Sequence, residues 1–162
     1  MASQHDIILE LDSWLAEIGS PLHGYADYTA ILSRQWGCVI TLPLAVGQAE
    51  TGCGTNPASD QTMVAGHNVW GYGKSSQPHG YLFPDWPNGI ASVTEKLAKF
   101  VHGQQADYPI CDTIEKLGSV WVYGDKTFQR IPENWVAAAA QVIARYGGNP
   151  EALSRSPLAR AI

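Results

Sequence analysis

Residues 39–54, VITLPLAVGQAETGCG, contain the most apolar helical segment of the sequence, which is expected to run from Val39 to Glu50. Up to Glu50 the side chains are apolar or small on every side, which is typical of a buried central helix. Pro43 either lies in the first turn of this helix or kinks it. Gly52 ends it, because glycine readily adopts the conformation that follows a helix C-terminus. Glu50 therefore lies roughly 10 Å along the axis from Pro43, at the C-terminal end of a buried helix.

Helical periodicity appears on both sides of this segment. Apolar residues at helical spacing predict further helices over about residues 4–18, 27–36, 88–101, 112–117 and 132–146. Ser3 and Asp6 have the spacing of a capping box at the first of them. From Thr51 to Asn88, the residue expected to cap the next helix, no sustained period exists, and so long a loop in a compact domain is usually functional. The sequence predicts an α+β, mainly α domain with an irregular or short β insert that forms a cleft.

Composition excludes several classes of protein. The 162 residues suit one domain, and 45% apolar residues exclude a disordered or fibrous chain. The net charge of -5, without a cluster of Lys and Arg, argues against nucleic acid as a partner. The sequence has no run of 18 apolar residues, so no membrane span is expected. Residues 1–11 lack the basic start of a signal peptide, and three cysteines allow at most one internal disulfide.

Glu50 is the residue that points most directly to chemistry. Burial raises the pKa of a carboxyl group by penalising the ion, and the negative end of a helix dipole acts in the same direction. A carboxyl group that stays protonated near neutral pH can give its proton to the leaving oxygen of a glycosidic bond. The glycines at 52 and 54 let the backbone turn sharply and leave space beside the carboxyl group.

Three segments, the first of which contains Glu50, occur in a recognisable order: residues 48–54 (QAETGCG), 67–73 (HNVWGYG) and 83–90 (FPDWPNGI). Together they resemble the A-x-E-S-G-x-G, N-N-x-F/W-G and F-x-S/D-W-x-x-G/S-I motifs of the lysozyme-like peptidoglycan glucosaminidases. This is the mannosyl-glycoprotein endo-β-N-acetylglucosaminidase-like family, which includes flagellar and autolysin enzymes. Residues 20–25 and 114–125 are similar to further segments of the family, followed by a terminal helix near Trp135. The resemblance covers about residues 20–147.

This resemblance implies a single lysozyme-like catalytic domain over residues 1–162, with Glu50 as the catalytic acid. It also implies that Asn68 and Trp70 line the cleft and that Tyr123 approaches Glu50 from the opposite wall. An asparagine can bind an N-acetyl group or clamp a backbone, and a tryptophan ring can stack on a pyranose. The remaining residues expected to bind substrate are His67, Tyr72 and Trp86.

A hydrolase that uses two carboxylates needs a partner for Glu50. The partner would lie about 5–5.5 Å away in a retaining enzyme or about 6.5–9.5 Å away in an inverting one. Asp60 and Asp85 lie in the insert and are the candidates, although both also suit turns or helix caps. If neither reaches the site, the acid works alone. That would suit a lytic transglycosylase, in which the 6-hydroxyl of muramic acid attacks and leaves a 1,6-anhydro ring.

Two other classes of function stay open. A cysteine amidase that cuts peptide stems would use Cys53 with a histidine, although a preceding helix C-terminus does not favour a thiolate. A non-catalytic glycan-binding module would keep the cleft, but it does not need an acid at position 50. Cys53, His67 and His79 match no compact zinc spacing, so no metal is expected.

The sequence thus predicts a monomeric enzyme that cleaves the β-1,4-linked glycan strands of peptidoglycan without a cofactor. Hydrolysis of the endo-β-N-acetylglucosaminidase type is the first choice, and lytic transglycosylation is the second. Its substrate lies outside the cytoplasmic membrane, yet no signal peptide is recognisable. We therefore expect action in the cell wall or periplasm after export by another route, or action as a phage lysin.

Overall fold

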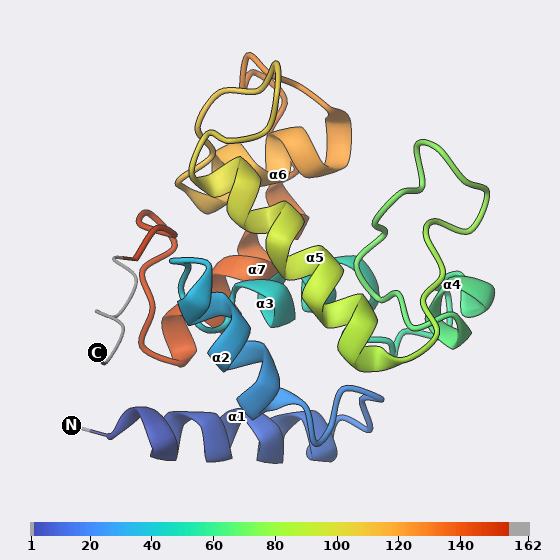
Figure 1. Cartoon of the computed structure of the whole chain (residues 1–162), viewed down its shortest axis with the longest axis vertical. Helices are drawn as coiled ribbons and strands as arrows, with labels where there is room; N and C mark the ends of the chain where they lie inside the picture. The colour runs from blue at the N-terminus through green and yellow to red at the C-terminus, as the bar shows by residue number, and fades with distance from the viewer. Residues whose placement is uncertain (1, 156–162) are drawn as a thin grey trace.

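The computed structural model describes residues 2–155, and this part of the chain is mainly helical (Figure 1). Its helices are α1 (Gln4–Glu17), α2 (Ala26–Gln35), α3 (Leu42–Thr51), α4 (Gln61–Ala65), α5 (Trp86–Val101), α6 (Ile114–Tyr123) and α7 (Glu133–Arg145). The predominantly α class that the sequence predicted is therefore confirmed.

Helix α3 is the buried centre of the fold. It contacts α2, α5 and α7, and in Figure 1 it lies behind α5 in the middle of the molecule. Every residue from Leu42 to Gly47 is buried. Pro43 lies in the first turn and does not kink the helix, because a proline there lacks only an N–H that has no helical partner. Gly52 ends α3 in the left-handed conformation at φ 59°, as predicted.

The ends of the outer helices follow local side-chain chemistry. Ser3 and Asp6 form the predicted capping box of α1. Asp85, and not the expected Asn88, caps α5, because the Asp85 carboxylate accepts the backbone N–H of Asn88 at 2.8 Å. Helix α6 begins after Thr113 and continues to Tyr123, so the prediction of a short helix over residues 112–117 was too short.

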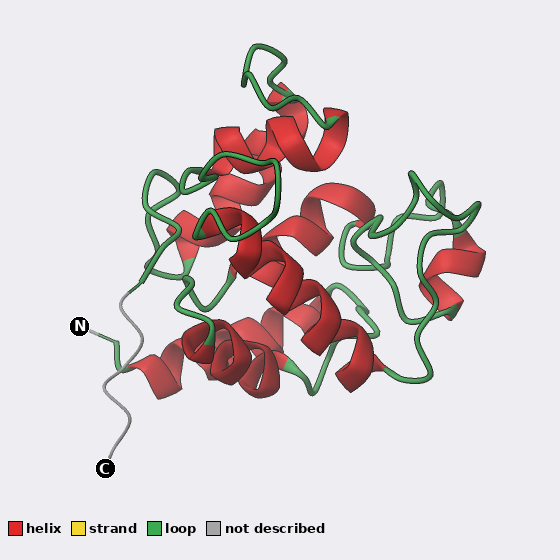
Figure 2. Cartoon of the chain, turned by 45° about the horizontal axis from the view of Figure 1, so that its top comes forward, coloured by secondary structure: helices red, strands yellow, loops and turns green. Residues whose placement is uncertain are grey.

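The segment from Gly52 to Asp85 is the irregular insert that the sequence predicted. Its one regular element is the short helix α4, and Figure 2 shows the rest as loops. Within residues 2–155 the only β pairing is two isolated bridges, both outside the insert: Cys38 with Ser154 and Asn149 with Ala152. The insert is thus held by side-chain hydrogen bonds and turns rather than by a sheet.

One hydrophobic cluster joins the large helices. It takes side chains from α1, α2, α3, α5, α6 and α7, and it extends into the insert through Val69 and Trp70. Cys38, Cys53 and Cys111 are buried and free, so the optional internal disulfide does not form. Among the described helices, none has both the length and the apolar character required to cross a bilayer.

Candidate active site

Glu50 lies in the last turn of α3 and is held by a side chain from another helix. The indole Nε1–H of Trp135, on α7, donates to Glu50 Oε1 at 2.9 Å. The other carboxylate oxygen, Oε2, lies against the backbone of Gly71. A Cβ atom added at Gly71 would come within 2.9 Å of Oε2 and would displace the carboxyl group, and the φ of 67° at this position also favours glycine.

The surroundings of Glu50 favour the protonated carboxyl group. Burial raises the pKa of Glu50 to about 6, against an ordinary value of 4.5. The hydrogen bond from Trp135 and the positive charge of Lys74 lower the pKa and oppose burial without cancelling it. Because Trp135 donates to Oε1, a proton on the neutral acid belongs on Oε2, the oxygen beside Gly71.

Asn68 holds the loop beside Glu50 together. It is fully buried, and its amide nitrogen donates to the carbonyl groups of Tyr72 and Tyr81 at 2.9 and 2.8 Å. Its carbonyl oxygen accepts the backbone N–H of Trp70 at 3.1 Å. All of these partners are backbone groups. Of the two roles that the sequence allowed, the backbone clamp is the one found, and the prediction that Asn68 contacts a sugar was wrong.

Trp70 also lies inside the protein rather than in a cleft. None of its surface is exposed, and its indole N–H donates to the carbonyl of Pro43 at 2.9 Å. Because a fully buried ring has no open face, the prediction that Trp70 stacks on a pyranose was wrong. Trp70 instead joins the start of α3 to the loop that carries Gly71.

Three other predicted residues form a half-buried aromatic group next to this loop. His67 contacts Trp86 edge to face, with ring centroids 5.1 Å apart, and its Nδ1 lies 2.8 Å from the carbonyl oxygen of Phe83. Tyr72 packs on Trp121 of α6 with ring centroids 5.9 Å apart. Tyr72 also contacts the exposed ring of Tyr81, with ring centroids 4.9 Å apart, and Leu82, the next residue in the chain, is exposed as well.

Tyr123 has a different set of contacts. It ends α6, is 41% exposed, and its ring is covered by the Arg130 guanidinium at 4.0 Å. No hydrogen bond or ring contact in residues 2–155 joins Tyr123 to Glu50, so the expected approach to the carboxyl group is not found. The side chain that reaches Glu50 is Trp135, which was expected only to lie near the start of the last helix.

Both candidate second carboxylates act as helix caps. Asp60 caps α4, and its Oδ2 lies 2.9 Å from His79 Nδ1 and 3.1 Å from Lys74 Nζ. These contacts hold the pKa of Asp60 far below its ordinary value, with the hydrogen bond from His79 as the largest cause. The pKa of Asp85 is also lowered, chiefly by the backbone N–H of Asn88. Each aspartate is thus held as an ion, and only Asp60 shares a neighbour, Lys74, with Glu50.

Cys53 does not have the setting of a nucleophile. Its side chain is fully buried, its thiol donates to the Leu44 carbonyl at 3.4 Å, and burial raises its pKa to about 12. A reactive cysteine needs the opposite, an exposed and stabilised thiolate. In the described part of the chain, no group of three or more His, Cys, Asp or Glu side chains has an arrangement that could hold a metal ion.

Comparison of the chain with protein-family models, with curated proteins and with solved structures finds no match. The geometry around Glu50 is therefore the main basis for a functional assignment.

Proposed function

We propose that this chain is a glycoside hydrolase of the endo-β-N-acetylglucosaminidase type that cleaves peptidoglycan, with Glu50 as its general acid. The observation that carries the proposal is the Glu50 carboxyl group: half-buried, fixed by Trp135, and with its pKa raised to about 6. An acid that protonates a glycosidic oxygen needs this pKa and a fixed orientation. The motif resemblance around residues 48–54, 67–73 and 83–90 supplies the substrate class.

In the proposed reaction, Trp135 holds Oε1 and the proton leaves from Oε2. The bond between the anomeric carbon and the bridging oxygen breaks, and its electron pair goes to that oxygen, which takes the proton from Glu50. Water then adds to the anomeric carbon and returns a proton to the carboxylate. Burial of Glu50 supports this order of events, because it favours the neutral acid before the bond breaks.

Asp60 is the better candidate for the second carboxylate. Lys74 contacts Asp60 directly and also acts electrostatically on Glu50, so the positive charge of one lysine affects both carboxyl groups. An ionised aspartate is what a general base or a nucleophile requires, and the low pKa of Asp60 satisfies this. Asp85 caps α5 and has no such link to Glu50.

A lytic transglycosylase is the second candidate function. The contacts of Asp60 also favour this function. Its carboxylate already binds Lys74, His79 and a backbone N–H at the start of α4, which are structural roles. If Asp60 serves only as a cap and an ion-pair partner, Glu50 is the sole acid. Attack by the 6-hydroxyl of muramic acid then completes the reaction without a second carboxylate.

Sugar rings would bind on the aromatic surface next to Glu50. Tyr72, Trp86 and the exposed Tyr81 offer side chains with an apolar body and a polar group, which suits amphiphilic sugars. Asn68 and Trp70 would hold this surface in place from below. The proposed site of action is the cell wall or periplasm, or a host wall attacked by a phage lysin.

The test is digestion of purified peptidoglycan by the wild type, by Glu50→Gln and by the matched control Glu151→Gln, which alters an exposed glutamate. Mass spectrometry of the products should show reducing N-acetylglucosamine ends from the wild type and the control, and none from Glu50→Gln. Products ending in 1,6-anhydromuramic acid would select the transglycosylase. Release of peptides alone, or binding to several walls without release, would contradict both glycosidase functions.

A further inference from the structure

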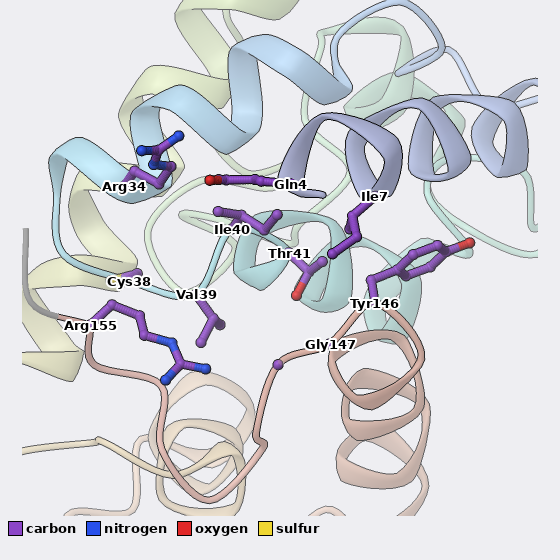
Figure 3. A pocket seen from close by; sticks show the side chains of 11 residues that line it. Gln4, Ile7, Arg34, Cys38, Val39, Ile40, Thr41, Tyr146, Gly147 and Arg155 are labelled. Atoms are coloured by element: carbon purple, nitrogen blue, oxygen red, sulfur yellow. The ribbon is translucent and has the colours of Figure 1, made fainter. Parts of the chain in front are cut away.

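A pocket lies at the opposite end of α3 from Glu50. Its volume is about 290 Å³, and it opens between the first turn of α1, the start of α3, the end of α7 and the segment that ends at Arg155 (Figure 3). Thr41, at the N-terminus of α3, lines it. Glu50 lies nine positions after Thr41 along α3, which corresponds to about 14 Å, so this pocket is separate from the proposed active site.

The pocket is positively charged in a chain whose net charge is negative. Arg34 and Arg155 line it, and none of its lining residues is acidic. Within residues 2–155, neither guanidinium lies within ion-pair distance of a carboxylate. Arg34 also lies in the last turn of α2, where a cation stabilises the helix end, but Arg155 follows no helix directly. Uncompensated guanidinium groups of this kind favour an anionic ligand.

The start of α3 adds a polar group without a partner. Thr41 is the N-cap residue of α3, yet its side chain makes no capping hydrogen bond. The residue is 1% exposed, and its hydroxyl has no hydrogen-bond partner within the described chain. Figure 3 shows this hydroxyl pointing toward Gly147, with the Arg155 guanidinium to its left in the view, below Val39. Buried hydroxyl groups normally have a partner, and the positive end of the helix dipole lies here as well.

The rest of the lining is apolar. Ile7 of α1 and the neighbouring Val39 and Ile40 supply aliphatic surface next to the polar groups (Figure 3). A bare inorganic anion would leave this surface uncovered. A small molecule with one anionic end and a short hydrocarbon body would cover both kinds of surface, as ligands in mixed pockets usually do.

We propose that this pocket is a second binding site, for a small organic carboxylate with a short apolar body. The carboxylate would accept hydrogen bonds from the Arg155 guanidinium and from the Thr41 hydroxyl, with Arg34 adding positive charge. Guanidinium groups match the planar geometry of a carboxylate, and such charge-assisted bonds are the strong ones. The hydrocarbon part would lie on Ile7 and Ile40. This site does not depend on the function proposed for Glu50.

The experiment is an NMR titration of the isotope-labelled full chain with hexanoate, hexan-1-ol and inorganic phosphate as separate probes. Hexanoate should give saturable shifts of the backbone amide signals of Ile7, Thr41 and Gly147, with a Kd of about 1 mM or tighter. Hexan-1-ol lacks the charge and phosphate lacks the apolar body, so each should bind at least about tenfold more weakly than hexanoate.

The variant Arg155→Gln should weaken hexanoate binding by at least about tenfold, because it removes a charge-assisted hydrogen bond. Arg155 is exposed, so the fold should survive, and an unchanged thermal unfolding midpoint would confirm this. Arg145→Gln is the matched control: the same change in charge, at a residue that does not line the pocket. The proposal is overturned if hexanoate causes no saturable shift, if hexan-1-ol or phosphate binds as tightly, or if both arginine variants bind hexanoate equally.

Discussion

Glu50 gains its character from the side chains that surround it rather than from its place at a helix end alone. Burial favours the neutral acid, the Trp135 indole favours the ion, and burial has the larger effect. The resulting pKa of Glu50 determines whether the carboxyl group can act as an acid, and it also determines how the free energy of unfolding depends on pH. Two substitutions separate these effects.

The first substitution is Glu50→Gln, which keeps an oxygen for Trp135 and removes the ionisation. In the folded chain the pKa of Glu50 is raised from 4.5 to about 6, so the folded state holds its proton more tightly than the unfolded state. The stability from this group is present below pH 4.5 and is lost as the pH rises through 6, by about 2 kcal/mol. Urea unfolding should therefore find the variant more stable than the wild type at pH 8 by up to about 2 kcal/mol. At pH 4 the variant's advantage in free energy of unfolding should be smaller by about 2 kcal/mol. The same advantage at both pH values would contradict the raised pKa of Glu50.

The second substitution is Trp135→Phe, which keeps an aromatic ring and removes the donor to Oε1. Since that hydrogen bond lowers the pKa of Glu50, its loss should raise the pKa above about 6. Activity depends on the protonated acid, so the alkaline limb of the pH–rate profile should move to higher pH. The maximal rate should fall about tenfold, because the acid loses its orientation. The control Trp14→Phe, on α1, should leave the limb in place, and a limb that moves to lower pH would refute this role of Trp135.

At the scale of elements, hydrogen bonds from individual side chains hold the conformation of the insert, whereas a β-sheet would be held by a ladder of backbone hydrogen bonds. Asn68 bridges two stretches of backbone, and Asp60 caps α4 while it binds Lys74 and His79. The loop that carries Gly71 is fixed to the helices through Trp70, which bonds to Pro43, and through Trp121, which donates to the Trp70 carbonyl at 2.9 Å. The position of the surface next to Glu50 follows from these contacts.

Asn68→Ala should therefore destabilise the protein by at least about 2 kcal/mol. It leaves the Tyr81 carbonyl and the Trp70 N–H without their partner and removes one of the two donors to the Tyr72 carbonyl, and unpaired buried polar groups are costly. Urea unfolding measures the loss, with Asn134→Ala at an exposed position as the control. A change below about 0.5 kcal/mol in Asn68→Ala, equal to that of the control, would show that the clamp contributes nothing.

Across the whole molecule, the three cysteines report on the integrity of one shared core. Their side chains are 2% exposed or less and belong to the same hydrophobic cluster. Burial also raises the pKa of the Cys38 and Cys53 thiols to about 12 and that of Cys111 to about 11. The reactive thiolate form is therefore scarce at any ordinary pH.

A thiol reagent at pH 8 should leave the native chain unlabelled and should modify all three cysteines once the chain is unfolded. The measurement is labelling stoichiometry across a urea series, which should follow the unfolding curve seen by tryptophan fluorescence. Rapid labelling of one thiol in native buffer would show that this cysteine is exposed. If that cysteine were Cys53, a cysteine amidase would again be a candidate function.

How much the sequence could predict is clearest at α3 and its surroundings. The buried character of residues 42–47, the glycine at the end and the Ser3–Asp6 capping box all rest on neighbours in the chain, and all were predicted, whereas the first turn was only one of two places expected for Pro43. The choice between Asp85 and Asn88 as a cap also depends on local geometry, but both residue types suit that position, so the pattern selected the wrong one. Glu50 itself was identified from its place after an apolar helix.

The local sequence by itself determined the central helix, the irregular insert and the position of the acid, because periodicity, caps and glycines act over a few residues. Only the tertiary structure decided what surrounds that acid. Trp135 reaches Glu50 across 85 positions of sequence, and Trp70 and Asn68 turn inward although their motif suggested a cleft. Such contacts depend on how helices far apart in the chain pack together, and no short-range pattern encodes which buried polar group will find which partner.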